Sequence, residues 1–284
     1  MTFRTRFAPS PTGPLHLGHA YSALYGHRLA EAKNGLWLLR IDDLDHSRSK
    51  PEWTQKIFDD LHWLGLAWPE PVRFQSQETD TYQTALDALA RARLIYPCCC
   101  NRADIAQAAA APQEGVPEFG PDGRIYPGTC RHRRLSQAGA GDALRLNMRK
   151  AVRALQKSVT YEEFGTQLSE RITLKPEALI AQAGDVVLRR KDQGAAYHLA
   201  VVIDDDAQNI TDVVRGADLS AATQIHVVLQ QLLNIQTPRY HHHALIRDET
   251  GKRLAKRSDS EALSTLRKAG HSAQNITERL FSAP

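Results

Sequence analysis

Residues 6–19 read RFAPSPTGPLHLGH, and this stretch decides the fold. Its prolines and first glycine follow a short apolar start, so they end a strand and shape a turn before a helix rich in alanine and leucine. The first turn of that helix offers backbone N–H groups and the positive end of the helix dipole, which suit a nucleotide phosphate. Gly18 lets a ligand approach the backbone. His16 and His19 are three residues apart, so both side chains can point at one ligand.

The first 95 residues alternate between strands and helices. Leu36 to Ile41 is a continuous apolar run, which is typical of a buried parallel strand. The other elements predicted here are a strand over 3–8, a helix over 20–33, a helix that opens at Pro51, and a helix over 81–94. This alternation predicts an α/β protein with a doubly wound, nucleotide-binding sheet.

The alternation stops at Tyr96-Pro97 and resumes near residue 185. Between them lie three consecutive cysteines, an alanine run and a segment rich in glycine and proline, which predict an inserted, loop-rich subdomain. Beyond it we expect a strand from Tyr197 to Asp204, a helix from Leu219 to Leu233 and a last strand from Tyr240 to Arg247. The predicted division is a catalytic domain in two halves (1–95 and 185–258), an insertion (96–184) and a short helical tail (259–284).

Composition favours a globular protein, and the charge distribution leaves the kind of partner open. No apolar run approaches the roughly 20 residues that cross a bilayer. The first six residues lack the apolar core of a signal peptide, so we expect a cytoplasmic protein. The net charge is +4, and residues 131–157 hold eight Lys or Arg against one acid, Asp142. That segment fits either a phosphate backbone or the solvated face of a helix, and the sequence leaves both open.

A second signature, Gly-Lys-Arg-Leu-Ala-Lys-Arg-Ser, occupies residues 251–258. A mobile loop that brings a cation to the leaving pyrophosphate of ATP stabilises the transition state more than the ground state. The two stretches together resemble the HIGH and KMSKS signatures of class I aminoacyl-tRNA synthetases, and RFAPSPTG is close to the form of their glutamyl branch. The resemblance implies a Rossmann-type core that binds ATP with Mg²⁺ through His16, Gly18, His19, Arg253 and Lys256. Among these, His16, His19 and Lys256 are the expected catalytic residues, while Ala255 departs from the family's serine.

The same resemblance implies a site for L-glutamate. A planar guanidinium can grip a carboxylate at two atoms, and the glutamyl branch uses arginines for the substrate side chain. Asp42 replaces the family's glutamate, one methylene longer, that receives the substrate ammonium group. The matching positions of this chain are Arg6, Ala8, Ser10, Asp42, Tyr197 and Arg215.

Two features bear on the RNA acceptor. Val201 stands where full-length glutamyl-tRNA synthetases have asparagine, and 27 residues follow Arg257, fewer than their anticodon-binding domain needs. Both features resemble a short paralogue within the glutamyl branch. The resemblance implies a monomer that activates glutamate to glutamyl-adenylate without tRNA and transfers it to queuosine in the anticodon of tRNA(Asp). A truncated glutamyl-tRNA synthetase charging a tRNA 3′ end, and a catalytically inactive RNA-binding relative, are the alternatives.

The four cysteines do not form the pattern of a disulfide framework. In an extended segment Cys98 and Cys100 share a face while Cys99 points away, and Cys130 follows a loop rich in glycine and proline. Three thiolates and one further ligand would complete a structural zinc site, for which chemistry alone favours His132. The short paralogue has Cys-x-Cys followed by Tyr-x-x-x-Cys, so the resemblance implies zinc held by Cys98, Cys100, Tyr126 and Cys130. Reduced cysteines without a metal are the alternative.

Overall fold

The computed structural model describes residues 2–109, 118–155, 158–164, 169–191, 194–246 and 262–282. Its strands of four or more residues are β1 (Arg4–Phe7), β2 (Leu36–Ile41), β4 (Ile95–Cys98), β7 (Ala143–Leu146), β8 (Val159–Phe164), β9 (Ser169–Leu174), β10 (Val187–Arg190), β12 (Asp212–Gly216) and β13 (Arg239–His243). Two-residue strands are β3 (Arg73–Phe74), β5 (Phe119–Gly120), β6 (Gly123–Arg124) and β11 (Gly194–Ala195). The helices are α1 (Leu17–Ala32), α2 (Pro51–Trp63), α3 (Thr79–Arg91), α4 (Arg102–Ala109), α5 (Met148–Ala154), α6 (Pro176–Ala178), α7 (Tyr197–Ala207), α8 (Ser220–Leu232), α9 (Leu263–Lys268) and α10 (Ala273–Phe281).

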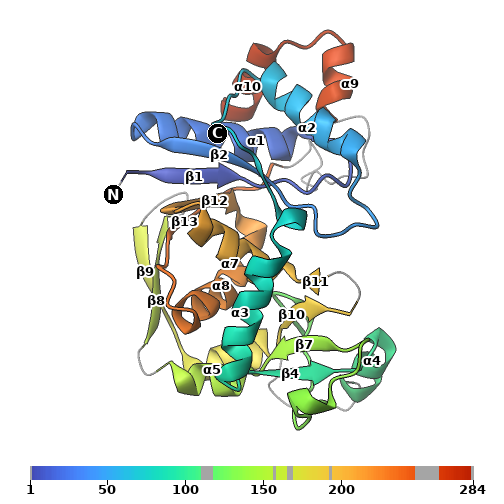
Figure 1. Cartoon of the computed structure of the whole chain (residues 1–284). Coiled ribbons are helices and arrows are strands. Elements are labelled where there is room, and N and C mark those ends of the chain that lie inside the picture. The colour runs from blue at the N-terminus through green and yellow to red at the C-terminus, as the bar shows by residue number, and fades with distance from the viewer. Residues whose placement is uncertain are drawn as a thin grey trace.

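Parallel strands form the centre of the molecule, as the sequence predicts. One sheet has the order β1-β2-β3 and another has the order β12-β13-β8-β9, in which β12, β13 and β8 run parallel. The two sheets meet where the backbone N–H of Thr211 donates to the carbonyl of Arg4 at 2.9 Å. Figure 1 shows α1 above these strands and α7 and α8 below them. This is the doubly wound α/β core.

The strand predicted from Tyr197 to Asp204 is wrong, because these residues belong to helix α7. Every residue from His198 to Asp205 is buried. A helix that is enclosed on all sides shows no 3.6-residue alternation of apolar and polar residues. A short apolar run with valine and isoleucine therefore fits a buried strand and a buried helix equally well. Packing of α7 against α3 and α8 selects the helix.

An antiparallel sheet of order β11-β10-β7-β4 contains the start of the predicted insertion. Strands β8 and β9 also fall within residues 96–184, yet β8 pairs with β13 of the parallel core. The pairing of β8 with β13 therefore crosses the predicted boundary between the insertion and the catalytic domain. The division into domains stays a prediction. A small separate core consists of Tyr96, Cys98, Tyr126 and Cys130.

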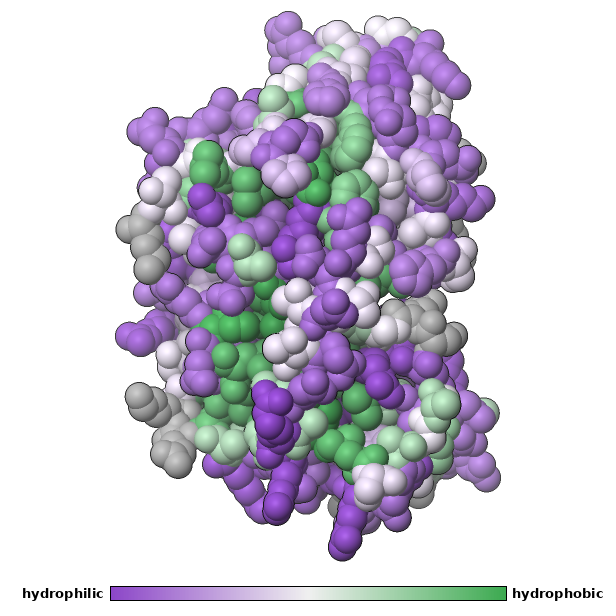
Figure 2. Space-filling view, in the orientation of Figure 1, coloured by the Kyte–Doolittle hydropathy of each residue, from purple (hydrophilic) through white to green (hydrophobic). Residues whose placement is uncertain are grey.

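Apolar residues form two larger cores. One lies between α1, α2, β1, β2 and the C-terminal helices, and the other lies between α3, α5, α7, α8 and the antiparallel sheet. Within the described ranges, no helix is long and apolar enough to cross a membrane. Figure 2 shows hydrophilic side chains projecting from the lower end of one face, where Figure 1 places α5.

Candidate active site

The two histidines of the opening motif cap helix α1. His16 is the N-cap residue, and its Nδ1 accepts the N–H of Gly18 at 3.1 Å, while the N–H of His16 donates to Nδ1 of His19 at 3.2 Å. Their ring centroids are 3.9 Å apart. The structure therefore brings the two predicted ATP-contacting rings together. The helix cap also uses the N–H of Gly18, one of the N–H groups that the sequence predicts to be available to a phosphate.

A buried cluster of charges joins β1, β2 and α7. Nε and Nη2 of Arg6 donate to the two carboxylate oxygens of Asp205 at 2.8 and 3.3 Å. Arg40 is fully buried and donates from Nε to Asp42 at 2.8 Å and from Nη1 to Asp205 at 2.6 Å. Burial would raise the pKa of Asp205, but Arg6 and Arg40 outweigh it and lower that pKa. Arg6, predicted to hold the glutamate side chain, is therefore already paired with a carboxylate.

Asp42 differs from Asp205 in its electrostatics. Burial raises the pKa of Asp42 to about 6, although Arg40 opposes the shift. The N–H of Asp42 donates to the carbonyl of Pro9 at 3.0 Å, which ties this carboxylate to the loop after β1. That loop carries Ala8, which is half-buried, and Ser10, which is exposed. Three residues predicted to meet glutamate thus lie on adjoining segments.

Arg215 has a different environment from Arg6 and Arg40. It is 6% exposed and donates from Nε to Nε2 of His242 at 3.2 Å, from Nη1 to Nδ1 of His226 at 3.1 Å and from Nη2 to Oγ1 of Thr223 at 2.6 Å. Burial and the nearby Arg215 charge lower the pKa of both histidines, to about 4 for His242. Both are therefore neutral at pH 7. Among the described residues, no carboxylate forms an ion pair with Arg215, so its charge is held by neutral acceptors.

Tyr197 contacts one of the partners of this arginine. Its ring meets the ring of His226 edge-on at 5.5 Å between centroids. Val201 follows one helical turn later on α7 and is buried. The structure therefore gathers Tyr197 and Arg215 around His226, a residue that the sequence analysis missed. Arg253 and Lys256 lie outside the described residues, so their predicted roles stay predictions.

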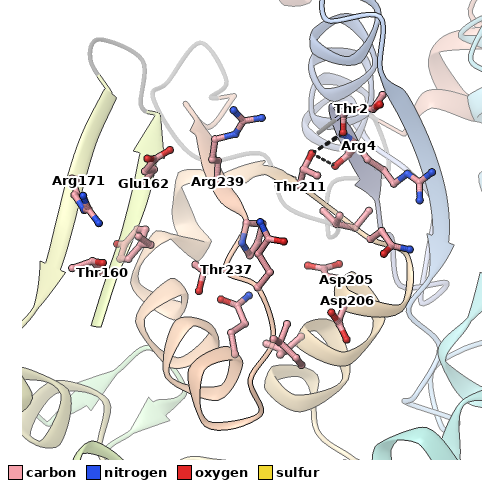
Figure 3. Close-up of a pocket in the computed structure, with 18 residues that line it drawn as sticks. Thr2, Arg4, Thr160, Glu162, Arg171, Asp205, Asp206, Thr211, Thr237 and Arg239 are labelled. Carbon is pink, nitrogen blue, oxygen red and sulfur yellow. Dashed lines mark hydrogen bonds between the residues drawn. The ribbon is translucent and has the colours of Figure 1, made fainter. Parts of the chain in front are cut away.

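A polar cavity of about 780 Å³ has Asp205 in its lining but none of the residues predicted to contact ATP or glutamate. It opens at the amino ends of the parallel strands, where Figure 3 shows Arg4, Thr211 and Arg239, with Glu162 and Arg171 of the β8–β9 hairpin opposite. Ligands of open α/β sheets bind outside the carboxyl ends of the strands. This cavity is therefore not the predicted catalytic site.

Three cysteines form a group that can hold a metal ion. The Sγ atoms of Cys98, Cys100 and Cys130 all lie within 4.8 Å of one another. The hydroxyl of Tyr126 is 3.4 Å from Sγ of Cys98 and 3.5 Å from Sγ of Cys100. Ligands on a tetrahedron with metal–sulfur bonds of about 2.3 Å are about 3.8 Å apart, so this spacing fits zinc. His132 is exposed and outside the group, so geometry favours Tyr126 as the fourth ligand.

A second cavity, of about 860 Å³, is strongly basic. Arg131 pairs with Asp185 at 2.7 Å and Arg133 pairs with Asp142 at 2.8 Å. In the part of the chain that the structure describes, no ion pair involves the remaining lining cations, which are Arg93, Arg134, Arg149, Lys150 and Arg153. All five are exposed. This surface can receive several anionic groups.

Comparison with known proteins identifies the family. Residues 2–281 match the family described as tRNA synthetases class I (E and Q), catalytic domain. The glutamyl-Q tRNA(Asp) synthetase of Rhodobacter capsulatus is 51% identical over 275 residues, covering 96% of this chain and 97% of that protein. The protein of the same name from Nitratidesulfovibrio vulgaris is 39% identical over 96% of this chain and 84% of its own length. The chain belongs to the class I tRNA synthetases and, within them, to the glutamyl-Q tRNA(Asp) synthetase family.

A solved structure shares the fold. The glutamate tRNA ligase of Elizabethkingia meningosepticum, crystallised with its amino acid, superposes with a TM-score of 0.69 at 25% identity. The match covers 90% of this chain and 52% of that ligase, so this chain spans about half the length of that enzyme.

Proposed function

We propose that this protein activates L-glutamate with ATP and transfers the glutamyl group to queuosine in the anticodon of tRNA(Asp). The observation that carries this proposal is the 51% identity, over nearly the full length of both chains, to a protein named glutamyl-Q tRNA(Asp) synthetase. In the first step, a glutamate carboxylate oxygen attacks the α-phosphate of ATP, forming glutamyl-adenylate and releasing pyrophosphate. In the second step, queuosine takes the glutamyl group and AMP leaves.

For ATP, we propose that His16, Gly18 and His19 contact the nucleotide, which binds with Mg²⁺. Lys256, with Arg253, would neutralise charge on the leaving pyrophosphate. Such a contact strengthens as the charge develops, so it lowers the barrier more than it tightens binding.

For glutamate, we propose that Arg215 binds the side-chain carboxylate. Its three protein partners are neutral, so its positive charge remains available to an anion. They use three of its five N–H groups, which leaves two for a carboxylate. Arg6 would position the site through Asp205, and Asp42, in its ionised form, would receive the substrate ammonium group. Ala8, Ser10 and Tyr197 would line the pocket.

We further propose that the cysteine group binds one structural zinc ion through Cys98, Cys100, Tyr126 and Cys130. Burial would raise the pKa of Cys130, but hydrogen bonds with Tyr126 and the neighbouring cysteines lower it to about 6, which favours the thiolate that binds metal. Four protein ligands leave no open position for a substrate, so the ion would contribute folding energy.

The basic cavity is our candidate for part of the RNA contact. Its five exposed cations can neutralise backbone phosphates, and each neutralised phosphate adds salt-dependent affinity. The monomeric state and the cytoplasmic location expected from the sequence stay predictions.

Two measurements test the proposal. The purified protein should catalyse glutamate-dependent exchange between ATP and pyrophosphate without tRNA, and labelled glutamate should then pass to tRNA(Asp) containing queuosine but not to tRNA(Asp) lacking it. Exchange that requires tRNA would contradict the proposed tRNA-independent activation. Label on a 3′-terminal hydroxyl would instead identify a truncated glutamyl-tRNA synthetase, and absence of exchange under all conditions would identify an inactive relative.

A further inference from the structure

A chain of hydrogen bonds runs from Arg215 into the predicted insertion. Nη1 of Arg215 lies 3.1 Å from Nδ1 of His226, and Nε2 of His226 lies 3.1 Å from Nδ1 of His198. Nε2 of His198 lies 3.2 Å from a carboxylate oxygen of Asp122. The two histidines are buried, on α8 and α7, while Asp122 occupies the turn between β5 and β6. Three segments far apart in the sequence therefore meet in one line of contacts.

Only one arrangement of protons satisfies every contact with neutral histidines. Arginine nitrogens donate and cannot accept, so Nδ1 of His226 must be the acceptor. Neutral His226 then carries its proton on Nε2 and donates it to Nδ1 of His198. That leaves the proton of His198 on Nε2, where it donates to Asp122. A carboxylate at the end of the chain thus sets the tautomer of both rings, since the hydrogen bond at one ring nitrogen fixes the role of the other.

We propose that Asp122, His198 and His226 act as a positioning relay that orients Arg215 for the substrate carboxylate without neutralising its charge. This inference rests on the proposed glutamate-binding role of Arg215. The relay makes Asp122, in the insertion, a determinant of amino-acid recognition in the catalytic core.

The two histidines of the relay are neutral, so they hold Arg215 without cancelling the positive charge that would attract glutamate. Arg6 shows the alternative, since its guanidinium makes two contacts with Asp205 and its charge is already compensated. A carboxylate at the position of His226 would do the same to Arg215 and weaken its attraction for glutamate. Two imidazoles separate Arg215 from Asp122, and one separates it from Glu163, so neutral acceptors hold the guanidinium and no described carboxylate pairs with it directly.

Asp122 has few other contacts in the described structure. Its second carboxylate oxygen lies 3.4 Å from the N–H of Val187, and its side chain is 38% exposed. Burial would raise its pKa, but the hydrogen bond from His198 outweighs this and lowers the pKa, so the carboxylate is ionised at pH 7. Its position at a turn allows substitution without opening a large core.

The kinetic test measures glutamate and ATP dependence of pyrophosphate exchange by the full chain. Asp122→Ala should raise the KM for glutamate by about tenfold, as expected for the loss of one oriented hydrogen bond to a charged group, and leave the KM for ATP within about twofold. His226→Leu should have a larger effect. The Oδ1 of asparagine can replace Nδ1 as acceptor, so His226→Asn should raise the KM for glutamate less than His226→Leu does. Glu118→Gln, which removes a charge near the same hairpin by breaking a pair with Arg124, is the matched control and should change neither KM.

A second measurement is independent of activity. Nitrogen-15 NMR of labelled histidine in the wild-type protein should show protons on Nε2 of both His198 and His226, and Asp122→Ala, which removes the acceptor, should disturb both signals. A proton on Nδ1 of either ring overturns the relay, as does a glutamate KM unchanged in a folded Asp122→Ala variant. Should the wild-type protein show no glutamate-dependent exchange, the proposed function fails while the NMR experiment still decides the relay.

Discussion

Arg215→Ala is the most informative perturbation of the amino-acid site. The wild-type guanidinium is 6% exposed, so a bound carboxylate would lose its partner in a largely water-free position. Breaking such a charge pair costs about 2–5 kcal/mol, which corresponds to a fall of about 30- to 5,000-fold in kcat/KM for glutamate. The KM for ATP should stay within about twofold, because none of the three hydrogen bonds of Arg215 involves a residue of the ATP motif.

The same substitution should not unfold the protein. Its partners Thr223, His226 and His242 are neutral, so no buried carboxylate is left unpaired, and the lost hydrogen bonds should cost about 1–3 kcal/mol of unfolding free energy. Removal of the nearby cation should also raise the pKa of His242 from about 4. Pyrophosphate exchange and thermal unfolding, with exposed Arg171→Ala as control, make the comparison. Equal losses for glutamate and ATP, or a glutamate effect below threefold, would refute the assignment of Arg215 to the substrate carboxylate.

Three further predictions concern other parts of the molecule. Cys130→Ser should remove one zinc per chain in metal analysis, lower the melting temperature and increase hydrogen exchange in the described parts of residues 98–134; a metal-free wild-type protein would remove the site. Because burial raises the pKa of Asp42 to about 6, kcat/KM for glutamate should fall between pH 7 and 5 as the carboxylate takes up a proton, and Asp42→Asn should lower this parameter and flatten its profile. An Asp42→Asn profile that keeps the same acid limb would contradict that role. Arg149→Glu with Arg153→Glu should raise the KM for tRNA(Asp) and weaken its salt dependence, while tRNA-free exchange stays unchanged; an unaltered KM for tRNA would exclude this cavity from the RNA contact.

Local patterns predicted the parallel core well. The apolar run from Leu36 to Ile41 coincides with β2, and the helix after the His-x-Gly-His motif is α1. These elements have one buried face or short apolar runs bounded by glycine and proline, which are visible in sequence. Helix α7 was predicted as a strand because its burial on all sides erases the periodicity on which such predictions depend.

Distance in sequence limited the prediction of the site. Motifs located Arg215 and Tyr197, since each lies in a short recognisable run. The relay of Asp122, His198 and His226 gave no such signal, because His198 is 28 residues from His226 and 76 residues from Asp122. Single histidines and aspartates at those separations acquire a common role only when the sheets, helices and insertion have packed.

The ion pairs of Arg6 with Asp205 also have a consequence for the order in which the protein is made. The two residues are 199 positions apart, and Arg40 is 165 positions from the same carboxylate. At roughly 5–20 residues per second, a ribosome needs about 10–40 s to bridge the longer gap. During that time Arg6 and Arg40 have been synthesised, but Asp205, their partner, has not. The N-terminal half therefore completes its charged interior only after α7 has left the ribosome.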